Sequence, residues 1–287
     1  MPALALTAVL LAALTHATWN LFAKKAAGSR RFVWLYSVGS VVLYAPVIAW
    51  IVVSERPHFG VRQWWALGAT SLLHLAYSLV LQAGYRVSDL SLVYPVARGS
   101  GPLLSFVGAV VLLGERPTGL SALGLVLIVG GILLVAGLTR EPHRAPRQGI
   151  LFGLATGLFI AAYTVNDGWA VKTLGVSPFI VDYTGNALRV AVLTPFALRN
   201  RSSLQSEVRA YAGPAAVVSV LGPLGYILVL FAMRYAPISH VAPARELATL
   251  VGAYFGSRLL RERSAPERLL GAALIVVGVI SLAFAGQ

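Results

Sequence analysis

The sequence predicts an all-α polytopic membrane protein with ten transmembrane helices, arranged as two inverted five-helix repeats. Composition gives the first indication, because 57% of the residues are hydrophobic and only 11% are charged. Soluble domains carry about 25% charged residues. The second indication is a weak internal repeat at a spacing of about 147 residues. Two copies with an odd number of spans must lie upside down to each other in a bilayer, which is the arrangement of many alternating-access carriers.

The repeat is visible in residue types that seldom coincide by chance in such an apolar chain. A shift of about 147 residues aligns Lys25/Lys172, Gly28/Gly175, Phe32/Phe179, Tyr36/Tyr183, Arg98/Arg245, Glu115/Glu262, Arg116/Arg263 and Gly124/Gly271. One residue more aligns Arg86/Arg234, Ser91/Ser239 and Pro95/Pro243. The domain prediction is therefore a first repeat over residues 1–138, a polar link over 139–148 and a second repeat over 149–287.

Ten apolar stretches are long enough to span a bilayer, which takes about 20 residues each. They are Ala3–Ala23, Phe32–Val53, Trp64–Tyr85, Leu90–Leu113, Gly119–Leu138, Gly149–Val171, Pro178–Leu198, Ala210–Met233, Ser239–Leu260 and Leu269–Ala285. The first is taken as a span rather than a signal peptide, because its basic residues follow the apolar run.

The loop charges predict the orientation. Loops that follow odd-numbered spans hold fifteen Lys and Arg residues, and loops on the opposite side hold five. Because basic loops stay in the cytoplasm, we expect both termini outside it and Thr139–Gln148 inside. The expected location is a bacterial plasma or inner membrane.

Several motifs together resemble a known family. They are the stretch His16-Ala17-Thr18-Trp19-Asn20 followed by Lys24, the run Ser91-Leu92-Val93-Tyr94-Pro95, the turn Gly114-Glu115-Arg116-Pro117 with Arg261-Glu262-Arg263 after span nine, and the glycine-rich fifth and tenth spans. The whole chain resembles the EamA-like branch of the drug/metabolite transporter superfamily. The resemblance implies a ten-span permease for amino acids, metabolites or drugs. It also implies cytoplasmic termini, contrary to the loop charges, so the direction of transport stays open.

The candidate site residues are polar groups inside the spans, since a charge at the bilayer centre costs about 3 kcal/mol and usually faces the bundle interior. Arg98 and Arg245 are the leading pair, each a few residues after a proline. We expect Pro95 and the glycines beside Arg98 to interrupt the fourth helix and line a cavity. Two arginines from opposite halves would bind a carboxylate or phosphate. The alternative is that Arg245 pairs with Glu246 and only fixes helix packing.

Asp167 and Glu246 are candidates for a substrate ammonium group or, at Asp167, a proton relay. Asp167 aligns with Asn20 in the repeat, which places both beside the predicted cavity. His16 is a second proton-coupling candidate, since histidine titrates near neutral pH. In the small multidrug resistance relatives a carboxylate stands at that place, and its absence here argues against a cationic drug.

Aromatic side chains within spans of both halves are candidate walls of a substrate chamber, or else ordinary packing residues. They are Trp19, Tyr77, Tyr94, Tyr163 and Tyr226. Glycines of spans five and ten, among them Gly124, Gly131, Gly271 and Gly278, favour close helix packing within a monomer or at a dimer face.

The sequence lacks a phosphate-binding loop, a dinucleotide glycine fingerprint, a zinc-protease helix and a nucleophile elbow. We therefore expect no enzyme activity, no cofactor and no metal site. We also expect no nucleic-acid partner, because the basic residues lie in short loops between apolar runs, which membrane topology explains. The predicted function is secondary transport of a small anionic or zwitterionic solute, such as an amino acid or organic acid. The predicted partners are that solute and the lipid bilayer, with the chain a monomer or homodimer. The alternative is a flippase for lipid head groups, which would show a lateral opening lined by basic residues.

Overall fold

The computed structural model describes residues 1–24, 30–88, 90–135, 147–199, 201–251 and 266–285. The described residues form helices joined by short connections, with no strand among them, so the all-α prediction is confirmed. The helices are α1 (Ala3–Lys24), α2 (Arg30–Glu55), α3 (Val61–Val87), α4 (Leu90–Leu113), α5 (Gly119–Val135), α6 (Arg147–Lys172), α7 (Pro178–Leu198), α8 (Arg201–Tyr235), α9 (Ile238–Ala244) and α11 (Pro266–Phe284).

Six of the described helices, α1, α2, α3, α4, α6 and α8, are long and apolar enough to cross a membrane. Helices α5 and α11 are apolar but shorter in their described parts. The prediction of ten spans is thus confirmed in part. Most of the predicted link over residues 139–148, the Arg-Glu-Arg motif at 261–263 and the end of the ninth stretch lie outside the described residues.

The predicted interruption of the fourth helix is wrong, because α4 runs unbroken past Pro95 and Pro102. The break lies in the ninth stretch instead, where α9 ends at Ala244 and a turn at Arg245 and Glu246 precedes a new helical segment at residues 247–251. At this turn the Glu246 amide donates to the carbonyl of Pro243 at 3.0 Å, three residues back. Such bonds tighten the backbone locally.

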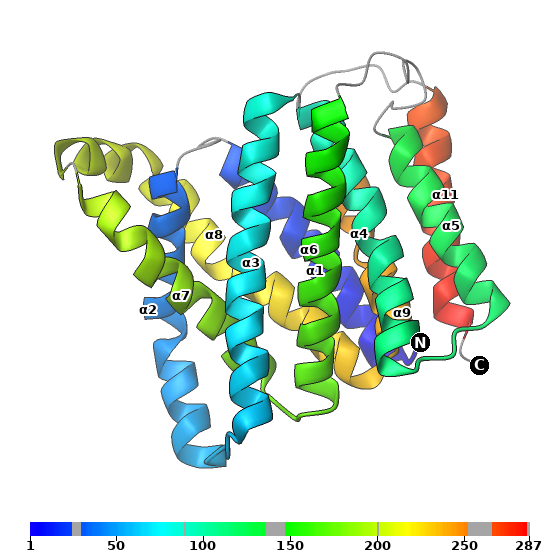
Figure 1. Cartoon of the computed structure of the whole chain (residues 1–287), viewed down its shortest axis with the longest axis horizontal. Helices are drawn as coiled ribbons and strands as arrows, with labels where there is room; N and C mark the ends of the chain where they lie inside the picture. Colours follow the sequence, from blue (N-terminus) through cyan, green and yellow to red (C-terminus); the bar gives the residue numbers. More distant parts are fainter. Residues whose placement is uncertain (25–29, 89, 136–146, 200, 252–265, 286–287) are drawn as a thin grey trace.

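The most extensive helix contacts join the first half of the chain to the second. Helix α6 packs against α3 and α4, α1 packs against α8, α2 against α7 and α8, and α5 against α11. Figure 1 shows α6 between α3 and α4 in the middle of the molecule, with α5 and α11 side by side at one edge. The centre of the bundle is therefore lined by helices of both halves.

Glycines allow α5 and α11 to touch through their backbones. A Cβ atom on Gly131 would lie 2.5 Å from the carbonyl oxygen of Gly271, and one on Gly271 would lie 2.7 Å from that of Gly131. Gly124 and Gly278 make a similar reciprocal contact further along the two helices. A Cβ atom on either glycine would lie 2.8 or 2.7 Å from the carbonyl oxygen of the other. These small residues serve packing within one chain, as is typical of close helix pairs in membranes.

The loop between α4 and α5 closes one end of the bundle. Gly114 takes a left-handed backbone conformation with φ +69°, which favours glycine. The following Glu115 accepts the backbone N–H groups of Ile238 and Ser239 at 2.7 and 2.9 Å, and the ammonium of Lys172 lies 3.6 Å from the carboxylate. A carboxylate of the first half thus caps a helix of the second half. The N-terminus and the described end of α11 lie at this same end, where the Met1 amine donates to the carbonyl of Ala283.

Candidate functional site

Arg98 lies at the centre of a buried polar group that joins both halves. Its guanidinium contacts the carboxylate of Glu246 at 3.1 Å and the Nε2 atom of His16 at 2.9 Å. The Arg98 Nε–H also donates to the hydroxyl of Tyr94, one turn earlier on the same face of α4, at 3.1 Å. A guanidinium only donates hydrogen bonds, so His16 accepts at Nε2 and its ring is neutral in this contact. We call Arg98, Arg245, Glu246 and His16 the arginine cluster.

Arg245 has two guanidinium nitrogens that make no hydrogen bond to the described residues. It is 8% exposed, and its Nε and Nη2 atoms have no hydrogen-bond partner among the described residues. The Glu246 carboxylate lies 3.6 Å from its Nε, beyond hydrogen-bond distance, because that carboxylate faces Arg98. The break between α9 and residue 247 places both side chains at the centre of the bundle. Two arginines share one carboxylate here, so one positive charge has no close counter-ion in the cluster.

The second polar group surrounds Asp167 of α6, which is fully buried. One carboxylate oxygen accepts from the hydroxyl of Thr70 and from the amide of Asn166, the latter at 3.2 Å. The other oxygen accepts from the hydroxyl of Tyr226 and contacts Nε2 of His74 at 3.0 Å. A carboxylate has about four lone-pair positions, and four groups occupy them here. We call these five residues the carboxylate cluster.

Tyr163 lies between the two clusters and contacts a residue of each. Its ring stacks on the imidazole of His74 with centroids 4.0 Å apart, and the guanidinium carbon of Arg245 lies 5.8 Å from the same ring's centroid. Tyr77 and Tyr226 meet the Tyr163 ring edge-on at 5.7 and 6.2 Å. A cation within about 6 Å of an aromatic face is attracted by the ring. The tyrosines therefore form a wall that runs from the free donors of Arg245 to Asp167.

The structure brings together most of the residues that the sequence analysis singled out. The two clusters and the wall between them contain eight of these residues: Arg98, Arg245, Glu246, His16, Tyr163, Tyr77, Asp167 and Tyr226. Tyr94 accepts a hydrogen bond from Arg98 at the edge of the arginine cluster. Trp19 lies beside the arginine cluster, with its ring centroid 4.9 Å from that of His16, but it packs mainly with Phe32 and Val218. Within the described part of the chain, no hydrogen bond joins Asn20 to either cluster.

Three residues of the carboxylate cluster were missed, namely Thr70, His74 and Asn166. Thr70, His74 and Tyr77 are spaced by four and three residues on α3, which places them on one helix face. The sequence shows that spacing, but it does not show that this face of α3 packs against Asp167 of α6. In the described residues no group of three His, Asp or Glu side chains is arranged to hold a metal ion. The site can neutralise an anion and hold or pass a proton.

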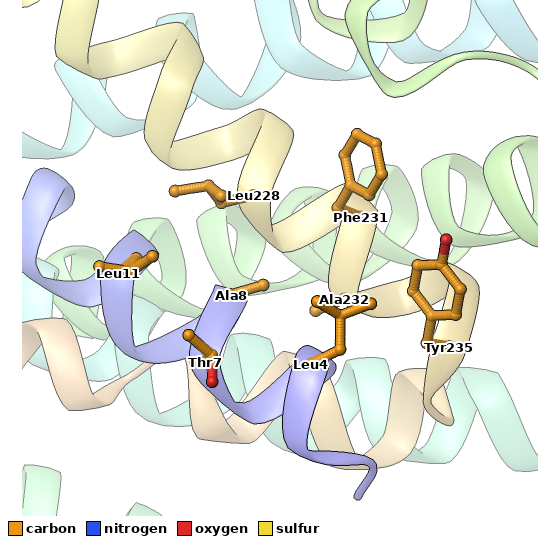
Figure 2. A pocket seen from close by; sticks show the side chains of 8 residues that line it. All are labelled: Leu4, Thr7, Ala8, Leu11, Leu228, Phe231, Ala232 and Tyr235. Atoms are coloured by element: carbon orange, nitrogen blue, oxygen red, sulfur yellow. The ribbon is translucent and has the colours of Figure 1, made fainter.

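A surface pocket lies away from both clusters, between α1 and α8, and Figure 2 shows its side chains. Its lining residues are all uncharged: Leu4, Thr7, Ala8, Leu11, Leu228, Phe231, Ala232 and Tyr235. Leu4 and Tyr235 are more than half exposed on the outer face. An apolar groove of this kind matches lipid tails. It lacks the basic lining that a lateral opening for lipid head groups would show.

Comparisons with known proteins agree with this architecture. A sequence model of the EamA-like transporter family matches the chain twice, over residues 3–137 and over residues 147–284. A solved crystal structure described only as that of a protein superimposes with a TM-score of 0.73 at 18% sequence identity, over 98% of this chain and 96% of that one. At this identity the likeness shows the fold alone. A search of curated proteins found no match.

Proposed function

The chain belongs to the EamA-like transporter family, and on this premise we propose that it is a secondary transporter of a small solute carrying a carboxylate, such as an organic acid or an amino acid. Membership of the family makes it a membrane transporter of the drug/metabolite type. The substrate class rests on the buried groups at the centre of the bundle. The proposed location is a bacterial cell membrane.

One observation supports the substrate class above the others. A buried guanidinium normally satisfies its donors, because an unpartnered buried polar group costs free energy comparable to a lost hydrogen bond. Among the described residues, the buried Nε and Nη2 atoms of Arg245 have no hydrogen-bond partner. These donors form part of the fork that binds a carboxylate at two points. A solute carboxylate seated there would complete the hydrogen bonding of Arg245 and neutralise the spare charge of the arginine cluster.

The carboxylate cluster is assigned a different role. All four positions of Asp167 are occupied, so an ammonium group of a zwitterionic solute would have to displace Tyr226 or His74. Glu246 is held by Arg98 and is not free for an ammonium group either. The contact between His74 and Asp167 joins two groups that can hold a proton. In our proposal this pair is the proton-coupling site, and His16, which accepts from Arg98, is not.

Alternating access by two inverted repeats is part of the proposal. The family model matches each half separately, and the spacing of the two matches agrees with the internal repeat. The reciprocal contacts of Gly131 with Gly271 and of Gly124 with Gly278 support it, because a two-fold axis between α5 and α11 would produce such pairs. Arg98 and Arg245 also occupy repeat-related positions around one carboxylate. Arg245 is buried and the side chain of Arg98 is only 14% exposed, so in this proposal helices move apart to admit a solute.

The substrate proposal predicts a ligand-dependent rise in the melting temperature of the purified protein. A ligand that binds only the folded state adds about 2.7 kcal/mol when present at a hundred times its dissociation constant. We expect stabilisation by members of a panel of amino acids and organic acids, and none by cationic dyes. Stabilisation by the dyes alone would contradict the proposal.

The loop charges predict that both termini lie outside the cytoplasm, with the link between the halves inside. Fusions of a reporter active only in the cytoplasm at Gln287 and at Arg144 test this orientation. We expect activity at Arg144 and none at Gln287. Activity at Gln287 would reverse the topology and agree with the orientation that the family resemblance implies.

A further inference from the structure

Glu246 occupies a place where it can set the charge that a bound solute must carry, and this inference rests on the proposed function. It is fully buried and lies within 3.6 Å of both arginines. One oxygen, Oε1, makes both contacts, while Oε2 accepts a hydrogen bond from the hydroxyl of Thr249 at 3.3 Å. Within the arginine cluster, Glu246 therefore supplies one negative charge, whereas two would be needed to neutralise Arg98 and Arg245.

The other charged and titratable groups near the cluster do not change this balance. His16 of α1 accepts a hydrogen bond from Arg98 and is neutral there. Tyr94 of α4 and Tyr163 of α6 contribute a hydroxyl and a ring face. Asp167 and His74 lie on the far side of the Tyr163 ring, within their own hydrogen-bond network. The cluster thus holds two positive charges and one negative charge, with the unpartnered donors on Arg245.

We propose that Glu246 is the specificity-determining residue for substrate charge, restricting the arginine cluster to solutes with a single carboxylate. A first carboxylate binds at Arg245 and neutralises the spare charge. A second carboxylate would meet Glu246 in a low-dielectric interior, where like charges repel strongly. Removing the negative charge of Glu246 removes this repulsion, so the arginine cluster can then bind a second carboxylate.

The inference is tested with two pairs of nearly isosteric probes, glutamine with glutamate and succinamate with succinate. Each pair differs by one carboxylate in place of an amide. The wild-type protein should bind the member with one carboxylate more tightly. Glu246→Gln should shift the ratio of dissociation constants by about tenfold or more toward the member with two carboxylates, the effect of one charge-assisted contact.

Two further variants distinguish charge selection from a structural role. In Arg98→Gln, Glu246 has only Arg245 left as a partner, so binding of the single carboxylate should fall by about tenfold. In the double variant Arg98→Gln with Glu246→Gln, Arg245 alone remains, and binding should recover with the preference of the wild type. Glu246→Asp retains the charge and should retain the preference. A purely structural pair would give a double variant that binds no better than Arg98→Gln.

The outcomes separate this inference from the proposed function. An unchanged ratio in Glu246→Gln, or a double variant without recovery, overturns the role of Glu246 while carboxylate binding by the wild type stands. If Glu246→Gln does not fold, the test is the affinity for the single-carboxylate probe. Its fall in Arg98→Gln and its recovery in the double variant then decide the role of Glu246. A wild type that binds none of the four probes overturns the inference, and the wider ligand panel then decides the proposed function separately.

Discussion

Arg245→Gln is expected to weaken carboxylate binding by about ten- to a hundredfold while leaving the melting temperature of the ligand-free protein nearly unchanged. Among the described residues its Nε and Nη2 donors have no hydrogen bond to lose, and its ion pair with Glu246 at 3.6 Å is longer than that of Arg98 at 3.1 Å. Loss of a charged contact costs about 1.5–3 kcal/mol, which corresponds to about ten- to a hundredfold in affinity. Arg245→Lys should also bind poorly, because an ammonium cannot reproduce the planar two-point contact.

Arg98→Ala is the matched comparison, and it should behave differently. Arg98 is the closest cation to the buried Glu246, and it also donates to His16 and Tyr94. Breaking a buried ion pair by removing one partner costs about 3–5 kcal/mol, so the melting temperature should fall markedly. Melting temperature and ligand binding measured on the same preparations separate the two arginines. If Arg245→Gln melts far earlier than the wild type and binds normally when folded, then Arg245 is a packing residue.

Gly131→Leu is expected to destabilise the protein strongly, and Gly130→Leu, its neighbour on α5, is the control. A Cβ on Gly131 would lie 2.5 Å from a backbone oxygen of Gly271, whereas a Cβ on Gly130 would meet no atom within 4 Å. The clash is with backbone, which cannot rotate away, so the cost should lie at the upper end of about 1–3 kcal/mol or exceed it.

Thermal unfolding of both glycine variants in detergent, followed by size-exclusion chromatography, measures this difference. Gly130→Leu should resemble the wild type in melting temperature and elution. Equal stability of the two variants would mean that α5 and α11 do not pack through these glycines.

The elements of the fold and the leading site residues could be predicted from the sequence because their signals are local. Apolar stretches of sufficient length and the internal repeat predicted the helices, and charges within apolar stretches pointed to Arg98, Arg245 and Asp167. The position of the helix break could not be predicted in this way. Prolines occur in both α4 and α9, and tertiary contacts decide which helix tolerates them.

The sequence also did not predict which arginine Glu246 contacts more closely. The repeat pairs Arg98 with Arg245 as equivalents, yet Glu246 contacts Arg98 at 3.1 Å and Arg245 only at 3.6 Å. An isolated sequence gives no sign of this asymmetry, because it depends on where α4 packs against the broken ninth stretch. His74 was missed for a related reason. A histidine on an apolar helix is usually a packing residue, and only the fold brings Asp167 to within 3.0 Å of it.

The cap that Glu115 places on α9 holds the two halves of the chain together at one end of the bundle. Any motion that separates the halves at this end must break the hydrogen bonds of Ile238 and Ser239 to that carboxylate and pull Lys172 away from it. Hydrogen bonds to a charged group contribute about 1.5–3 kcal/mol each. Breaking the two bonds to Glu115 therefore costs several kcal/mol before water can take their place. In the alternating-access cycle that we propose, opening this side would require that step, so weakening the contact, as in Glu115→Gln, is expected to change the turnover rate.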